Sequence, residues 1–171
     1  MKRTATLLGV VLLTASIMTG AIACSSDDED SHSGDEATAT APADTTPAAG
    51  AAVTVNLTEY IVSPAQESVP AGPVTFTAKN IGGTVHELVV IKTDLSPESL
   101  PTVADGSVDE AGEGVELIGE VEDLASETEG DISVELEAGA YVLLCNVVEE
   151  SETGGTVVHY AEGMTTAFTV E

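Results

Sequence analysis

The stretches YVLLCN (residues 141–146) and HYAEGMTTAFTV (residues 159–170) decide the expected fold. In each stretch alternate residues share one face: Tyr141, Leu143 and Cys145 in the first, and Thr166, Phe168 and Val170 in the second. Alternation with a period of two is typical of a β-strand that has one buried face. The carboxyl end of the chain is therefore predicted to form two such strands.

The same alternation recurs upstream from residue 51 onward. Four further segments show it. The residues that share a face of each expected strand are Val53, Val55 and Leu57; Val74 and Phe76; His86, Leu88 and Val90; and Ile132, Val134 and Leu136. Gly, Pro and Asn separate the six segments, and no segment has sustained helical spacing, although residues 101–125 have room for a short helix. The pattern predicts an all-β sandwich or barrel, with the acidic residues 94–129 as a surface loop insertion.

The amino terminus has the layout of an export signal. Residues 1–4 are short and positive, and residues 5–18 form an apolar run that is too short to span a bilayer comfortably. The run ends at AIAC (residues 21–24), which resembles a bacterial lipobox with Ala21 where Leu is usual. We expect a signal peptide over residues 1–23 and lipidation of Cys24. The alternative is plain secretion with Cys24 unmodified.

Residues 24–50 differ in composition from the rest of the chain. After Cys24 they contain seven acids with Ala, Thr, Ser and Pro, but no aromatic residue and no Leu, Ile or Val. Such a segment cannot bury enough apolar surface to offset its ordering entropy. We expect a disordered acidic tether that leads to a folded domain over residues 51–171. The domain would lie on the extracellular or periplasmic side of the cytoplasmic membrane, anchored by lipid.

The chain is strongly acidic. Its formal net charge is −26, and without residues 1–23 the remaining 30 acids face only Lys79 and Lys92, for a net charge of −28. This balance argues against nucleic-acid binding, which needs Lys and Arg to contact the phosphates, and against a polybasic segment that binds anionic lipid. It leaves two interpretations open, which are attraction of basic partner proteins and adaptation to saline surroundings.

Four scarce side chains stand out in the predicted domain. His86, Cys145, His159 and Met164 are its only histidines, cysteine and methionine. Taken singly, a strand Cys, a Met or a His is more often a packing residue than a ligand. Two imidazoles, a thiolate and a thioether together form the donor set of blue-copper sites. The sequence therefore predicts a metal site with copper as its ion.

The context of these residues resembles the cupredoxins, the type 1 blue-copper family that includes plastocyanin and azurin. The resemblance lies in the Gly-bearing turn before His86 (residues 80–86), in residues 131–146 with Cys-Asn at the end, and in residues 159–170. It implies a Greek-key β-sandwich or barrel in which His86, His159 and Cys145 bind one type 1 copper with Met164 as a weak axial ligand. Asn146 would support the turn beside the thiolate.

One spacing departs from the family. Cupredoxins usually place two to four residues between the Cys and the second His, whereas thirteen lie between Cys145 and His159. The extra residues resemble a polar hairpin between two Val-Val pairs. Such a hairpin could return His159 to the site, displace it, or leave the site exposed and flexible.

Three functions follow as hypotheses. The first is a membrane-tethered, monomeric copper protein that shuttles single electrons between redox partner proteins. The second is a copper protein that stores, senses or delivers copper without redox cycling, and the third is a metal-free binding module. An enzyme is not expected, because the chain lacks a nucleophile elbow, a phosphate-binding Gly loop and the histidines for a second copper centre.

Overall fold

The computed structural model describes residues 50–151 and 154–171. The predicted signal peptide, Cys24 and nearly all of the tether lie outside these residues. The strands are β1 (Ala51–Thr58), β2 (Ile61–Pro64), β3 (Ser68–Val69), β4 (Gly72–Asn80), β5 (His86–Lys92), β6 (Glu116–Leu124), β7 (Glu129–Leu136), β8 (Gly139–Leu144), β9 (Val148–Glu150), β10 (Thr156–Val158) and β11 (Thr165–Val170). One short 3₁₀ helix, η1 (Pro97–Ser99), completes the described elements. No helix in the described part of the chain is long and apolar enough to cross a bilayer.

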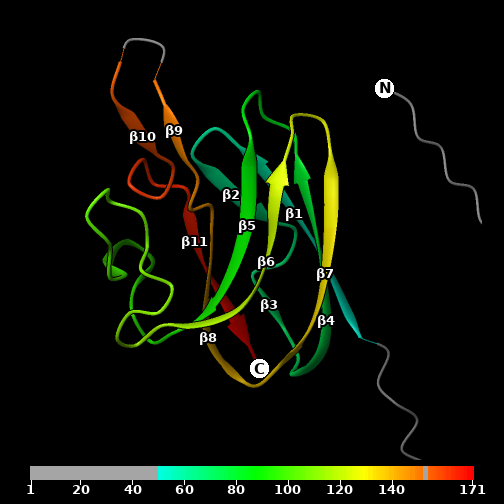
Figure 1. The fold of residues 1–171 in the computed structure, drawn as a ribbon. Coiled ribbons are helices and arrows are strands. Elements are labelled where there is room, and N and C mark those ends of the chain that lie inside the picture. The colour runs from blue at the N-terminus through cyan, green and yellow to red at the C-terminus, as the bar shows by residue number, and fades with distance from the viewer. Residues whose placement is uncertain (1–49, 152–153) are drawn as a thin grey trace, which may run out of the picture. The chain divides into compact units, whose positions relative to one another are not determined.

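Nine of these strands form two packed sheets, which Figure 1 shows as a sandwich, while β9 and β10 form a separate two-stranded sheet. One sheet has the order β2-β1-β4-β7 and the other the order β3-β11-β8-β5-β6. The β1–β4 and β3–β11 pairs are parallel, and the remaining pairs are antiparallel. Neighbours in a sheet are often distant in sequence, because the chain passes repeatedly from one sheet to the other. The predicted all-β sandwich is confirmed.

The core lies between the sheets and is built from the alternating positions that the sequence singled out. Val53, Val55 and Leu57 of β1 are at most 1% exposed. Phe76 of β4 and Phe168 of β11 meet edge to face with ring centroids 5.5 Å apart, so they join the two sheets. Edge-to-face geometry is a favoured arrangement of aromatic pairs.

The acidic stretch over residues 94–129 is not entirely a surface loop. Residues 116–124 form β6, which pairs with β5 at the edge of the five-stranded sheet. The short helix for which residues 101–125 had room is not present there, and the nearest helical turn is η1. The preceding residues 94–115 do run outside the sheets, and Leu100 and Val108 pack with Val158 and Tyr160 in a second small core.

The extra residues between Cys145 and His159 form the predicted hairpin. Strands β9 and β10 pair antiparallel with Val148 opposite Val158. Figure 1 shows this hairpin projecting at one end of the sandwich, near the start of β11. Its two ends stay adjacent, because the His159 N–H donates to the Val147 carbonyl over 3.0 Å. The insertion therefore returns the chain to where it left.

Candidate metal centre

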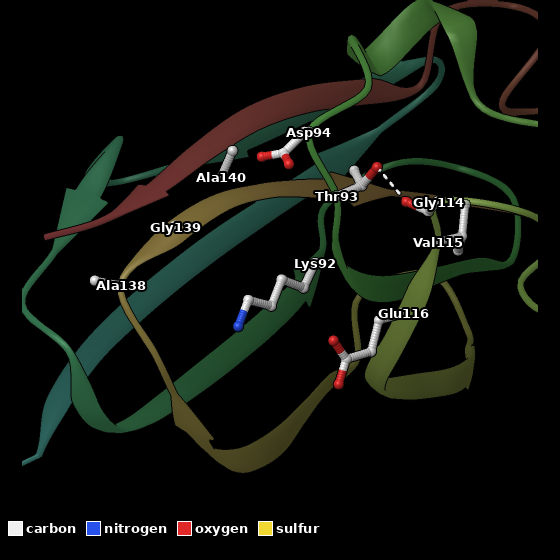
Figure 2. A pocket seen from close by; sticks show the side chains of 9 residues that line it. All are labelled: Lys92, Thr93, Asp94, Gly114, Val115, Glu116, Ala138, Gly139 and Ala140. Carbon is white, nitrogen blue, oxygen red and sulfur yellow. Dashed lines mark hydrogen bonds between the residues drawn. The ribbon is translucent and has the colours of Figure 1, made fainter.

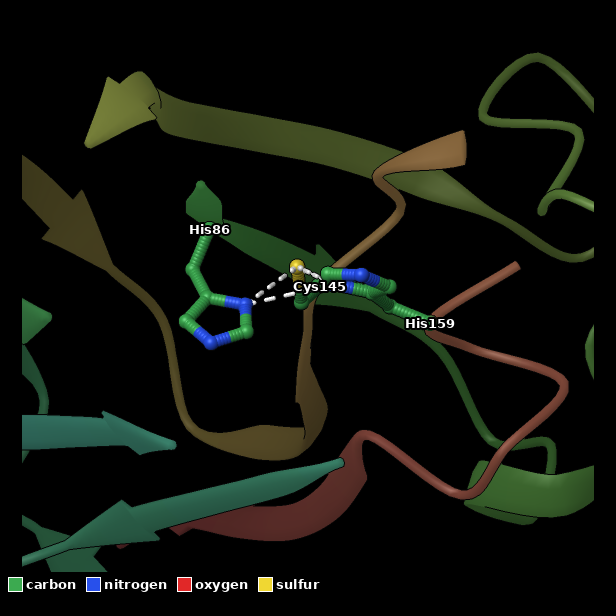
Figure 3. A group of neighbouring side chains, drawn as sticks. All are labelled: His86, Cys145 and His159. Carbon is green, nitrogen blue, oxygen red and sulfur yellow. Dashed lines mark hydrogen bonds between the residues drawn. The ribbon is translucent and has the colours of Figure 1, made fainter. Parts of the chain in front are cut away.

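Three of the four predicted ligands meet in one buried cluster. The ligand atoms of His86, Cys145 and His159 all lie within 4.8 Å of one another. Figure 3 shows the two imidazoles pointing toward the Cys145 sulfur from different sides. His86 and Cys145 have no exposed surface, and His159 is 1% exposed. The structure thus brings together residues that lie 73 positions apart in the chain.

Backbone hydrogen bonds hold the cluster in place. The Cys145 N–H donates to the Met164 carbonyl, and the Met164 N–H donates to the His159 carbonyl, both over 3.0 Å. Strand β8 ends just before Cys145 and β11 begins just after Met164, with Leu144 paired to Thr165. The turn from His159 to Met164 is therefore anchored beside the end of β8. Gly163 lies in this turn at φ +97°, a conformation that favours glycine. Three of the four predicted ligands are therefore linked through main-chain contacts.

Met164 is buried beside the cluster. Its side chain has no exposed surface and belongs to the same packed core as Cys145. Together with the two backbone bonds, this burial places Met164 next to Cys145 and His159, where a thioether ligand is expected. Its role as the axial ligand stays a prediction.

The turn before His86 is organised by Asn80. This side chain is 1% exposed, and its amide donates to the carbonyls of Thr84 and Leu124 over 2.7 and 2.8 Å. Its oxygen accepts the Gly82 N–H over 2.9 Å. A fully satisfied buried amide is a strong local constraint. Asn80 therefore sets where β5 begins and directs His86 into the core.

The spacing of the ligand atoms fits a metal ion. The two Nδ1 atoms are 3.2 Å apart, and Cys145 Sγ lies 3.9 Å from Nδ1 of His86 and 3.3 Å from Nδ1 of His159. Metal–nitrogen bonds of about 2.0 Å and metal–sulfur bonds of about 2.3 Å in trigonal or tetrahedral geometry separate the ligand atoms by about 3.3–3.8 Å. The observed distances of 3.2, 3.3 and 3.9 Å span this range and exceed it by about 0.1 Å at each end.

Burial favours the uncharged forms of two of the ligands. Burial raises the pKa of the Cys145 thiol to about 11, so a metal is needed to hold the thiolate at neutral pH. Burial, and then the neighbouring His159, lower the pKa of His86. The imidazole of His86 is therefore neutral at pH 7 and has a lone pair to offer a metal.

Asn146, which was expected to support the turn beside the thiolate, bonds to two other parts of the chain. Its side-chain oxygen accepts the Val108 N–H over 2.7 Å, and its amide donates to the Val108 carbonyl and to Glu110. Its own N–H donates to Glu87 over 2.8 Å. Asn146 therefore clamps the end of the Cys145 turn to the outer loop of residues 94–115.

Sequence reasoning missed two carboxylates next to the imidazoles. Glu149 Oε1 lies 3.2 Å from His159 Nε2. Glu59, in the turn between β1 and β2, accepts a hydrogen bond from the Gly83 N–H, which lowers the pKa of Glu59. Glu149 lies in the insertion between Cys145 and His159. The only sequence signal there was the alternation of residues along a strand, which does not show that Glu149 contacts His159. Nothing in the sequence marked Glu59.

The half-buried carboxyl of Glu87 gives a pH-dependent prediction. Burial raises its pKa from 4.5 to about 7, and the nearby Glu110, Glu120 and Glu122 add to the rise. The folded protein thus holds this proton more tightly than the unfolded chain does, so the contribution is most favourable below about pH 4.5. It is lost as the pH rises through about 7.

Glu87→Gln should therefore raise the free energy of unfolding at pH 8 by roughly 1–3 kcal/mol, with little gain at pH 4.5. The glutamine oxygen can still accept the Asn146 N–H. Urea titrations at the two pH values measure the difference, and Glu135→Gln, at an exposed position of β7, is the control. An equal gain at both pH values would show that the charge is not the cause.

A separate hollow lies at the other end of β5 and β8 (Figure 2). It is lined by Lys92, Thr93, Asp94, Gly114, Val115, Glu116, Ala138, Gly139 and Ala140. The Thr93 hydroxyl donates to the Gly114 carbonyl over 2.7 Å, and Lys92 pairs with Glu137. None of the predicted metal ligands lines this hollow, so it is not part of the metal centre.

Comparison with solved structures decides the fold family. The auracyanin of the photosynthetic bacterium Roseiflexus castenholzii is 22% identical, and the match covers 72% of this chain and 98% of that one, with a TM-score of 0.50. The chain has the cupredoxin fold. No protein-family model matches the sequence, and no curated protein matches it either.

Two other cupredoxin structures score lower. Auracyanin A of Chloroflexus aurantiacus, described as a "blue" copper protein, is 18% identical over 70% of this chain and 99% of that one, with a TM-score of 0.44. Rusticyanin of Thiobacillus ferrooxidans is 17% identical over 72% and 79%, with a TM-score of 0.41.

Proposed function

We propose that the protein binds one copper ion and carries single electrons between redox partner proteins. The observation that carries the proposal is the buried cluster of two Nδ1 atoms and one sulfur at metal-ligand spacing. Thiolate and thioether ligands suit Cu(I), and imidazole suits both oxidation states. The donor set therefore favours a redox-active copper site over a site for a hard cation.

In this proposal the chain holds the copper and shields it. His86, Cys145 and His159 would bind the ion, with Met164 as the weak axial ligand, and bound copper would supply the one-electron couple. The core around Cys145 excludes water, since this side chain has no exposed surface. The paired β8 and β11 limit movement of the ligands, which keeps rearrangement on electron transfer small.

The second hypothesis, copper storage or delivery, loses the observation that favoured it. It depended on an insertion that left the site open and pliable. In the structure β9 and β10 are paired, and His159 is 1% exposed beneath them. A covered site exchanges metal slowly, so the described geometry favours a carrier.

The partner and the location belong to the same proposal. Lys79 and Lys92 are both paired with glutamates, at 2.7 and 2.6 Å. The acids of the domain therefore outnumber its free cations heavily, which supports attraction of basic redox proteins. We propose a monomer held at the outer face of the cytoplasmic membrane through lipidated Cys24. Partner association that does not weaken with added salt would contradict the electrostatic part.

The test is the visible and electron-paramagnetic-resonance spectrum of the protein with one equivalent of Cu(II), followed by voltammetry. We expect an intense visible band, narrow copper hyperfine splitting and a reversible one-electron wave. A pale spectrum with ordinary splitting would show that the thiolate site does not assemble. An intense band together with rapid loss of copper to a chelator would instead support delivery.

A further inference from the structure

The Nε2 atoms of the two histidines play no part in the proposed donor set, yet both are buried. Both Nδ1 atoms face the cluster, so both Nε2 atoms face away from it. Among the described residues, each Nε2 is buried and forms no completed hydrogen bond. The carboxylate of Glu149 nevertheless lies 3.2 Å from His159 Nε2, which is within ion-pair distance.

We propose that Glu149 is a positioning residue that orients His159 toward copper and tunes the site in favour of Cu(II). This inference rests on the proposed copper-binding function. A neutral imidazole that binds metal through Nδ1 carries its proton on Nε2, and that proton needs an acceptor when it is buried. Metal-binding histidines commonly donate this proton to a carboxylate, which fixes the tautomer and the ring orientation.

The extra hairpin provides this carboxylate. Glu149 lies in β9, directly opposite Val157 of β10, and the hairpin is joined to the site by the bond from His159 N–H to the Val147 carbonyl. The Glu149 side chain is about one-third exposed, whereas the imidazole that it contacts is 1% exposed. The unusual spacing between Cys145 and His159 therefore places a negative charge over the outer edge of the second histidine.

A second contact also constrains the His159 ring. Tyr60, at the β1–β2 turn, meets the His159 ring edge to face with centroids 5.7 Å apart. With Tyr60 and Glu149 both in contact, His159 has little freedom to rotate away from the cluster. A ring held in this way is preorganised for metal, which raises affinity without any added ligand.

The charge also distinguishes the two oxidation states. A carboxylate hydrogen-bonded to the imidazole makes its Nδ1 a stronger donor. The more highly charged Cu(II) gains more from this donor, and from the nearby negative charge, than Cu(I) does. Loss of the Glu149 charge should therefore weaken Cu(II) binding more than Cu(I) binding.

The experiment compares full-length wild type with Glu149→Gln and Glu150→Gln. Successive strand residues point to opposite faces, and Glu150 is exposed, so it is a matched control one position away. Chelator competition measures the affinity for each copper state, and voltammetry measures the potential. Circular dichroism of the copper-free proteins checks the fold.

We expect Glu149→Gln to lose about 10–100-fold in Cu(II) affinity, with a smaller loss for Cu(I). A tenfold larger loss for Cu(II) corresponds to a potential about 59 mV higher. Glu150→Gln should match wild type in all three measurements. Glu149→Asp, which keeps the charge on a side chain one methylene shorter, should restore part of the difference.

The outcomes separate this inference from the proposed function. If wild type has the intense band and Glu149→Gln equals Glu150→Gln in affinity and potential, the positioning role is wrong while the copper function stands. If wild type itself lacks the band, the proposed function fails, and the inference fails with it. If Glu149→Gln does not fold, a shift in Glu149→Asp relative to wild type still supports the role, and no shift overturns it.

Discussion

Replacing Cys145 with serine should abolish the intense visible absorption of the copper-loaded protein. The band arises from the thiolate, and the serine hydroxyl is not a soft ligand that copper deprotonates at neutral pH. Loss of a residue that only hydrogen-bonds to a metal ligand typically costs about 10–100-fold in affinity. Because Cys145 would be a ligand itself, we expect copper affinity to fall by at least about 100-fold. The substitution is small, so the sandwich should stay folded. Absorption spectra and copper competition measure both effects.

Cys24→Ser is the matched control for this experiment. It removes the only other cysteine of the chain and should leave the visible band unchanged. The same variant tests the anchor, because loss of lipidation should release the protein from the membrane fraction. If colour survived in Cys145→Ser, the thiolate assignment would be wrong. If Cys24→Ser stayed membrane-bound, the lipid anchor would be wrong.

The second large effect is expected for Gly82→Ala, a change outside the donor set. A Cβ at Gly82 would lie 2.9 Å from His86 Nε2 and 2.9 Å from a Glu59 carboxylate oxygen. The backbone cannot easily retreat, because the Gly82 N–H is bound to Asn80 and its carbonyl accepts the Ser126 hydroxyl. The His86 ring must therefore shift. We expect a loss of roughly 10–100-fold in copper affinity and about 1–3 kcal/mol of stability from overpacking.

Gly83→Ala provides the comparison at the next residue. Its Cβ would meet only a Glu59 oxygen, at 3.3 Å, and the end of a flexible side chain can move. Copper competition and urea unfolding of both variants measure the difference. Equal losses in the two variants would show that the loop as a whole, and not the closeness of Gly82 to His86, controls the site.

The strands that the sequence predicted are those with a buried face. Alternation at Val53, Val55 and Leu57, and again at Phe168 and Val170, follows from burial between two sheets, so the residue types report it directly. Strand β6 was missed because it lies at a sheet edge, where most of its side chains remain partly or fully exposed. Edge strands are held by backbone bonds on one side and often carry charges. Their sequences therefore resemble surface loops.

The sequence by itself determined which side chains could form the metal centre, because His86, Cys145, His159 and Met164 are the only residues of their types in the domain. It also determined the β class, through alternation of apolar and polar residues. Only the tertiary structure decided that thirteen extra residues still return His159 to Cys145. Hairpin pairing and a single backbone bond to Val147 produce that return, and pairing register depends on contacts across strands. For the same reason, the carboxylates of Glu59 and Glu149 came to lie beside the two imidazoles without any signal in the local sequence.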